Sequence, residues 1–380
     1  MKPKNEKQPK TWRKVKLGEV LELKYGFGLP ETKRKTGRVP VFGSSGIVGA
    51  HNEAAVQSQG IVIGRKGHVG SIHYSNVPFY PIDTVYYVDQ LKIPGDIKFF
   101  YYFLKRMPFQ QIGSDVGVPG LNRDIAYSLE VKIPEDPNEQ KRIADILSAF
   151  DEKIELNNKI SKNLEAIAQA IFKEWFVSPS IALAEEDKLP KGWRVGKLGE
   201  LMVARKEKFR KYEEWKNLKL LDLGRFPQKS LAITSYGKGE EIKTAGIGFK
   251  KGDVLFGAVR PYFHKVVIAP FDGVTNSSVF VITPKKESSY AFLVTVLFSE
   301  NTVNYASMSA SGTKMPVIKW EDLCDMEVLI PEERAIENFN KTVKNFYNLI
   351  IKNTLENQKL ASLRDLLLPK LMSGKILVKS

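Results

Sequence analysis

The amino-acid sequence predicts an α+β protein with two similar strand-rich domains in tandem, each followed by a long amphipathic helix. Three observations carry this prediction: an internal repeat, short β-branched and aromatic runs bounded by Gly and Pro, and two long heptad patterns. The 380 residues, with 43% hydrophobic content, are also enough for roughly two or three domains with buried cores.

The repeat is clearest at the two ends of each half. WRKVKLGEV from Trp12 returns as WRVGKLGEL from Trp193, and LEVKIPEDPNEQ from Leu129 returns as MEVLIPEERAIE from Met326. Between them, GIVIGRKGHVG aligns loosely with GDVLFGAVRPY, and the SDVGVPG segment at 114–120 aligns with SASGTKMP. The spacing between matched segments grows along the chain, which predicts extra loop residues in the second copy.

Within each half, the runs IVIG, DTVYYV, DVLFGAV and SSVFVITP predict short strands. Residues 98–106 and 290–298 predict one short helix in each domain. These elements make each domain α+β, with irregular loops between its strands.

Each half ends in a predicted long helix. Apolar residues recur at alternating three- and four-residue steps from Ile143 to Ile171, and again from Phe339 to Leu371. Equal positions in the two copies favour pairing of the helices, although each helix covering only its own domain is the alternative. The predicted divisions are 1–138 for the first domain, 139–177 for its helix, 178–335 for the second domain with a linker at 178–191, 336–373 for its helix, and 374–380 for a tail.

Composition indicates the class of partner. The 58 Lys and Arg against 43 Asp and Glu give a net charge of +15, which favours nucleic acid. The single cysteine, Cys324, excludes an intrachain disulfide and favours a reducing cytoplasm. No apolar run is long enough to cross a bilayer, so we expect no membrane partner.

Motifs for catalysis and cofactors are missing or incomplete. No P-loop or methyltransferase motif is present, and the four histidines lack the spacing of a metal site, so we expect no cofactor and no metal. Asp83 with Glu130 and Lys132 imitates the D…ExK pattern of metal-dependent nucleases, and a stand-alone nuclease is kept as the alternative. A basic coiled-coil adaptor without sequence preference is a third possibility.

Four loops combine flexible backbone with cations or hydroxyl groups. Such loops allow close approach to phosphates, while arginine and lysine reach base edges or neutralise charge. Ordinary hairpin turns with solvated charges are the alternative. The residues expected to contact DNA are Ser44, Ser45, Arg65, Lys66 and His68 in the first domain, and Arg260, Tyr262, Lys265, Thr313 and Lys314 in the second.

Taken in order, these segments resemble the specificity subunit of type I restriction-modification systems. The helix-end motifs LNNKI…IFKEWF and LLLPKLMSGKI are its most specific part, and the resemblance covers essentially the whole chain. It implies two target recognition domains related by a pseudo-twofold rotation, with the long helices packed as an antiparallel coiled coil. Each domain would recognise one half of a bipartite DNA target, and the helices would set the spacer.

The resemblance also implies partners. Methyltransferase subunits, expected in two copies, would carry S-adenosylmethionine, and restriction subunits would carry ATP-driven translocation and cleavage. We expect the methyltransferase subunits to dock at the helix ends, where Trp175, Phe176, Leu368 and Leu371 offer apolar surface. The second domain lacks the FGSSG loop and carries a basic run at 203–211, so the domains need not contact DNA through matched residues.

Overall fold

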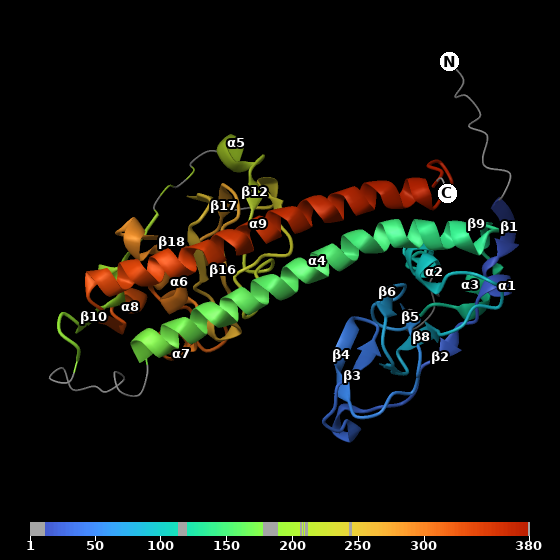
Figure 1. The fold of residues 1–380 in the computed structure, drawn as a ribbon, viewed down its shortest axis with the longest axis horizontal. Coiled ribbons are helices and arrows are strands. Elements are labelled where there is room, and N and C mark those ends of the chain that lie inside the picture. The colour runs from blue at the N-terminus through green and yellow to red at the C-terminus, as the bar shows by residue number, and fades with distance from the viewer. Residues whose placement is uncertain are drawn as a thin grey trace, which may run out of the picture. The chain divides into compact units, whose positions relative to one another are not determined.

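The computed structural model describes residues 12–112, 120–177, 189–205, 207, 209, 212–242 and 245–378, and Figure 1 labels many of its elements. The chain divides into two compact units. Unit 1 comprises residues 1–151 and 362–380, and unit 2 comprises residues 152–361. The loop at 114–119, residues 178–188 of the predicted linker, and residues 206, 208, 210 and 211 of the basic run lie outside the described residues.

Unit 1 is built on two sheets and a strand pair. Strand β1 (Trp12–Lys16) pairs antiparallel with β9 (Glu130–Pro134), which joins the two ends of the first repeat. The four-stranded sheet has the order β2-β8-β5-β6, with β2 (Lys24–Tyr25), β5 (Gly60–Gly64), β6 (Ile72–Ser75) and β8 (Val85–Val88). The second sheet has the order β4-β3-β7, with β3 (Val39–Gly43), β4 (Gly46–His51) and β7 (Tyr80–Pro81).

Short helices complete the core of unit 1. Asp96 caps the N-terminus of α2 (Ile97–Leu104) by accepting a hydrogen bond from the Phe99 amide. The apolar face of α2 packs on β5 and β6, and all five residues of β5 are buried. The other short helices are α1 (Leu17–Val20), α3 (Arg123–Ser128) and the 3₁₀ turn η1 (Glu31–Lys33).

Unit 2 repeats this plan. Strand β10 (Arg194–Lys197) pairs with β19 (Glu327–Ile330) as β1 pairs with β9. One sheet has the order β11-β18-β15-β16, with β11 (Met202–Ala204), β15 (Val254–Gly257), β16 (Val266–Ile268) and β18 (Val279–Pro284). The other has the order β13-β12-β17-β14, with β12 (Lys219–Leu220), β13 (Gly237–Lys238), β14 (Ile247–Phe249) and β17 (Gly273–Thr275).

The helices of unit 2 follow the repeat as well. The counterpart of α2 is α6 (Tyr290–Leu297), every residue of which is buried. Its Ala291 amide donates to Asn340 Oδ1 at 2.8 Å. The remaining short helices are α5 (Tyr212–Trp215), α7 (Glu300–Ser309), α8 (Trp320–Cys324), and the 3₁₀ turns η4 (Leu198–Glu200), η5 (Gly239–Glu241), η6 (Pro261–Phe263) and η7 (Glu287–Ser289).

Two of the four-stranded sheets, β2-β8-β5-β6 in unit 1 and β11-β18-β15-β16 in unit 2, have the same topology. In each, the second strand pairs antiparallel with the first and third, and the third pairs antiparallel with the fourth. The parallel pair β3–β7 likewise has its counterpart in β12–β17. The extra residues of the second copy lie between β12 and β15 and include β14, which confirms the inserted loop that the repeat predicts.

The two long helices are α4 (Pro137–Phe172), followed by a π-helical turn (Lys173–Val177), and α9 (Glu333–Leu371). In unit 1, Asp151 of α4 forms an ion pair with Arg364 of α9. In unit 2, Asn157 contacts Asn357, and Ser161 contacts Asn353. Later residues of α4 therefore meet earlier residues of α9, which confirms antiparallel pairing.

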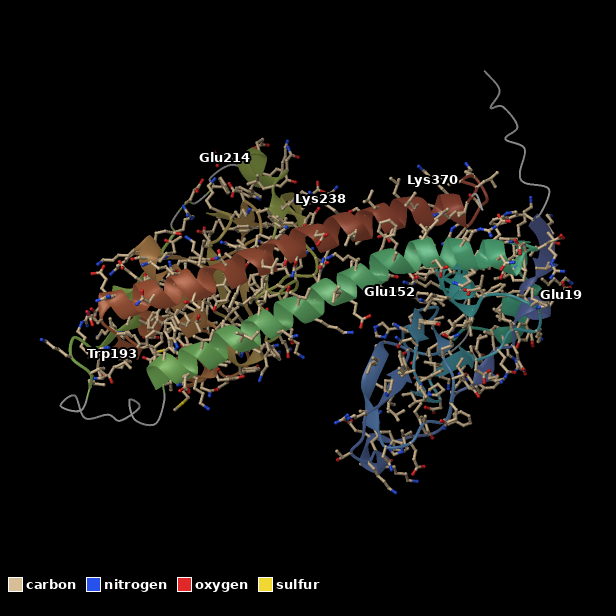
Figure 2. The ribbon with its side chains drawn as sticks, viewed as in Figure 1. Glu19, Glu152, Trp193, Glu214, Lys238 and Lys370 are labelled. Atoms are coloured by element: carbon tan, nitrogen blue, oxygen red, sulfur yellow. The ribbon has the colours of Figure 1, made fainter. Side chains whose placement is uncertain are left out.

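Figure 2 draws the side chains along both helices, and Glu152 marks the first residue of unit 2 on α4. Each long helix thus contributes residues to both units, unlike the predicted divisions, which give each helix as a segment of its own. Among the described residues, no helix is long and apolar enough to cross a membrane.

Candidate nucleic-acid interface

In unit 1, the two predicted loops meet at Ser44. The turn between β3 and β4 relies on Gly46, whose φ of 104° suits glycine. The His68 amide, in the loop between β5 and β6, donates to Ser44 Oγ at 3.4 Å, and Ser71 Oγ donates to the Ser44 carbonyl. The His73 ring also approaches that carbonyl, and burial lowers the pKa of His73, which keeps the ring neutral at pH 7.

This contact leaves polar side chains at the surface. Ser45, Lys66 and His68 are exposed, whereas Ser44 is half-buried because its oxygens accept the hydrogen bonds between the loops. A bridge between the backbones of Lys66 and Gly120 ties a third segment to the same loop. The structure therefore brings together the five residues predicted for the first domain at one edge of unit 1.

Arg65 is the most constrained of these residues. Its amide donates to the Thr84 carbonyl at 2.9 Å, and its Nη2 donates to the Asp83 carbonyl at 2.7 Å. The guanidinium carbon lies 5.2 Å from the ring centre of Tyr25 and 5.9 Å from that of Tyr86. Its Nε is buried without a partner. The side chain is thus oriented before any ligand arrives.

Unit 2 holds Arg260 in a similar way. The Arg260 amide donates to the Pro316 carbonyl at 2.7 Å, and Nη2 donates to the Lys314 carbonyl at 3.2 Å. These bonds join the turn η6 to the loop that carries Thr313 and Lys314, both of which are exposed. Tyr262 is 53% exposed beside them.

Backbone strain gathers at this turn. Arg260 and His264 both have φ of 50°, and Lys229, whose amide donates to the His264 carbonyl, has φ of 52°. Left-handed conformations cost free energy for residues other than glycine and are common at functional sites. The His264 ring is buried against the Phe298 carbonyl, and desolvation lowers its pKa.

Lys265 makes contacts within unit 2. Its Nζ donates to the Leu223 carbonyl and lies 5.9 Å from the ring centre of Phe263. The ammonium group is partly buried inside unit 2, where it satisfies a carbonyl. Lys265 stays a predicted DNA contact, with its ammonium group held at the Leu223 carbonyl.

The two constrained arginines occupy equivalent places. Arg65 follows β5 and Arg260 follows shortly after β15, the third strands of the two matching sheets. Each guanidinium is anchored by one carbonyl across a loop, and each Nε is buried without a partner. Sequence alignment missed this match, because pairing Gly64 with Gly257 sets Arg65 opposite Ala258.

Three further residues near the predicted contacts were not predicted from the sequence. In unit 1, the Arg123 guanidinium lies 5.2 Å from the same Tyr25 ring that Arg65 contacts. In unit 2, Met308 and Met315 are exposed near the ends of the Lys314 loop. Arg123 lies on α3 and Met308 on α7, and neither helix carries a motif of its own.

The predicted apolar docking residues are largely buried. Phe176 and Leu371 are each 2% exposed, so the expectation that they present free surface is wrong. The Phe176 ring packs on Phe292 and Phe339, with ring centres 5.2 and 5.3 Å away, and Leu371 lies in the core of unit 1. Trp175 is partly exposed, and Leu368 is half-buried.

Other apolar side chains of the long helices are exposed instead. An amphipathic period shows that a face is apolar, but it does not show which neighbours cover that face. The exposed positions are Ile146, Leu156 and Ile167 on α4 and Leu349, Leu363 and Leu366 on α9.

The nuclease residues do not form a metal site in the structure. Asp83 lies between β7 and β8, whereas Glu130 lies on the separate β1–β9 pair, where its carboxylate contacts Lys14 Nζ at 3.4 Å. Within the described part of the chain, no group of three His, Cys, Asp or Glu residues could hold a metal ion.

The chain is similar to proteins of one family throughout its length. The model of the type I restriction modification DNA specificity domain matches residues 9–166 and 190–364, one match for each copy of the repeat. These matches and the relatives below support a specificity subunit over the nuclease alternative.

Two relatives and one solved structure illustrate the similarity. The type I restriction enzyme MjaIX specificity subunit of Methanocaldococcus jannaschii is 27% identical over 423 residues, covering 98% of this chain and 95% of the relative. The HindI specificity subunit of Haemophilus influenzae is 24% identical, covering 68% and 71%. The S subunit of a type I system from M. genitalium has the same fold, with a TM-score of 0.61, 18% identity and 98% coverage of both chains.

Proposed function

This chain belongs to the family of type I restriction-modification DNA specificity subunits, and from that membership we propose that its two units recognise the two halves of a bipartite DNA target. The observation that carries the proposal is the matched pair of arginines. Arg65 and Arg260 follow equivalent strands, and each is oriented by a carbonyl across a loop. Because the two units share a fold but differ in the side chains around these arginines, they suit two different half-sites of the DNA target.

In each unit, the candidate loops combine side chains that suit base recognition with side chains that suit phosphate binding. An arginine fork matches O6 and N7 of guanine in the major groove, and orientation before binding lowers the entropy cost. Hydroxyl groups such as those of Ser45 and Thr313 can accept hydrogen bonds from base edges or donate hydrogen bonds to them. The exposed Lys66 and Lys314 suit phosphates, which fix register without carrying sequence information.

The long helices supply the surface for partners. We place the docking of methyltransferase subunits, in two copies, on the exposed apolar residues of α4 and α9, including Leu156, Ile167, Leu363 and Leu366. Those subunits would carry the methyl donor, and restriction subunits would join through the assembled complex. We propose a cytoplasmic location, which the single cysteine favours.

Methylation mapping tests the function directly. The chain is expressed with its methyltransferase subunits in a host that lacks modification, and the methylated positions are sequenced. We expect one asymmetric motif with two specific parts and a non-specific spacer. Methylation without sequence preference would favour the adaptor alternative, and cleavage of a plasmid by the lone chain with Mg²⁺, abolished by Asp83→Ala, would favour the nuclease.

A further inference from the structure

Tyr25 lies between two arginines in unit 1. The ring centre is 5.2 Å from the guanidinium carbon of Arg65 and 5.2 Å from that of Arg123, and the ring is tilted against Tyr86 at 5.0 Å. The Tyr25 side chain is 49% exposed, so this cluster is at the surface. Three elements far apart in the sequence therefore place two cations beside one accessible aromatic ring.

Hydrogen bonds hold these elements in place. The Leu121 amide donates to the Arg65 carbonyl at 2.9 Å, and the Tyr86 hydroxyl donates to the Leu121 carbonyl at 3.1 Å. The Asn122 side chain accepts from the first amides of α3, which fixes the helix on which Arg123 lies. The position of Arg123 next to Arg65 is thus set by the fold.

The positive charge of the cluster is not neutralised within unit 1. Among the described residues, no carboxylate forms an ion pair with Arg65 or Arg123, whereas nearby Lys24 pairs with Asp89 at 2.7 Å. Burial raises the pKa of Tyr86 to about 12, so its hydroxyl group stays neutral at pH 7. Each guanidinium carbon lies 5.2 Å from the Tyr25 ring centre, so an anion beside Tyr25 would be attracted by both cations.

We propose that Arg123, supported by Tyr25, binds a backbone phosphate of duplex DNA next to the base that Arg65 contacts. This proposal rests on the proposed function and adds a binding site to it. A phosphate supplies the negative charge that both arginines lack, whereas a base edge supplies only neutral acceptors. The phosphate contact would add affinity for the duplex without carrying sequence information, and base choice would stay with Arg65.

The test compares variants of the assembled complex with its methyltransferase subunits. Binding to the target duplex is measured by fluorescence anisotropy across a range of salt concentrations. Arg123→Ala should weaken binding roughly tenfold and lower the slope of log K against log salt by about 0.9, the value for one lost phosphate contact. Arg123→Lys should keep most of the slope, because the charge remains, and should weaken binding less.

Matched controls separate this site from general charge and from misfolding. Arg13→Ala removes an exposed arginine from β1 of the same unit and should leave the slope unchanged. Thermal melting and co-purification with the methyltransferase subunits check assembly of each variant, and the methylated motif should not change. If Arg123→Ala disrupts folding, Arg123→Gln and Arg123→Lys carry the comparison.

Three results would overturn the proposal: an unchanged slope in a folded Arg123 variant, an equal loss in Arg13→Ala, or relaxed choice of one base in the Arg123→Ala methylation map. The last result would mean that Arg123 contacts a base. A wild-type complex without any bipartite target would instead contradict the proposed function itself.

Discussion

At the scale of single residues, anchored side chains distinguish the candidate interface from ordinary turns. Arg65 and Arg260 each donate to a carbonyl from another loop, although arginine in a solvated turn would normally stay free. Holding a long side chain in place costs entropy during folding rather than during binding. The left-handed backbone at Arg260 adds to this cost and fits a site maintained for binding.

Replacing either arginine should affect one half of the target only. We expect Arg65→Ala and Arg260→Ala each to cost roughly 1–3 kcal/mol of specific binding and to relax one base position in one half-site. Arg65→Lys should not restore the selectivity, because lysine lacks the planar fork. Methylation mapping of each variant checks this. A motif that stays intact in both alanine variants would mean that these loops only close hairpins.

A second prediction at this scale concerns Glu165 on α4. Its buried carboxylate accepts hydrogen bonds from Ser230 Oγ at 3.0 Å and the Leu231 amide at 2.8 Å, and it ties a loop of unit 2 to the helix. Desolvation nevertheless raises its pKa. The folded state therefore binds a proton more tightly than the unfolded state, and ionisation of Glu165 costs stability as pH rises through its folded pKa.

Glu165→Gln removes this titration and keeps an acceptor oxygen. As pH falls from 7 toward the usual pKa range of carboxyl groups, the melting temperature of the wild type should rise relative to that of the variant. Comparing the two proteins at each pH cancels the titration of all other groups. If the difference between the two melting temperatures stays constant from pH 7 to pH 5, the pKa of Glu165 is not raised in the folded state.

At the scale of elements, the apolar periodicity predicted which helices form, but it did not predict which residues cover them. The long helices, α2, α6 and the tandem repeat all follow from apolar patterns in the sequence. The burial of Phe176 and Leu371 did not follow, because a heptad pattern does not specify what covers the end of a helix. The equivalence of Arg65 and Arg260 was hidden by unequal loops, and the place of Arg123 depends on contacts between distant segments.

Polar residues interrupt the apolar seam between α4 and α9. Asn353 is 4% exposed and donates to Ser161 Oγ at 3.2 Å, while Asn157 donates to Asn357 Oδ1 at 2.9 Å. Buried asparagine in a helix pair reduces stability but selects one register, since a shifted register leaves the amide unpaired.

Replacing Asn353 and Asn157 together with leucine should therefore raise the melting temperature and loosen the register. We expect Asn353→Ala alone to cost about 1–3 kcal/mol, because Ser161 loses its partner in a buried position. The double variant is assayed by thermal melting and by methylation mapping, where spacers of more than one length are expected. If the double variant is more stable but still methylates sites with a single, unchanged spacer, the asparagines do not set the register of the two helices.

At the scale of the whole molecule, the net charge of the chain and the length of its two long helices have separate roles in DNA recognition. The net charge of +15 attracts DNA over distances comparable to the screening length, and it does so for any sequence. Base identity depends on a few anchored residues in each unit. The length of the target is then expected to depend on the uninterrupted helices, because each of them contributes to both units.

The last prediction separates the spacer from the bases. Four residues are inserted in α4 between Ile160 and Leu164, and four in α9 at the facing stretch between Asn353 and Asn357. Four residues add nearly one helical turn, which keeps the apolar seam roughly in phase, and they lengthen each helix by about 6 Å. With a base-pair step of roughly 3.4 Å, the same two half-sites should be methylated with a spacer longer by about one or two base pairs. Inserting two residues at the same points turns the apolar face away from its partner and should prevent assembly, which provides the control. Altered bases in either half-site, together with the original spacer, would show that the helices do not set the distance.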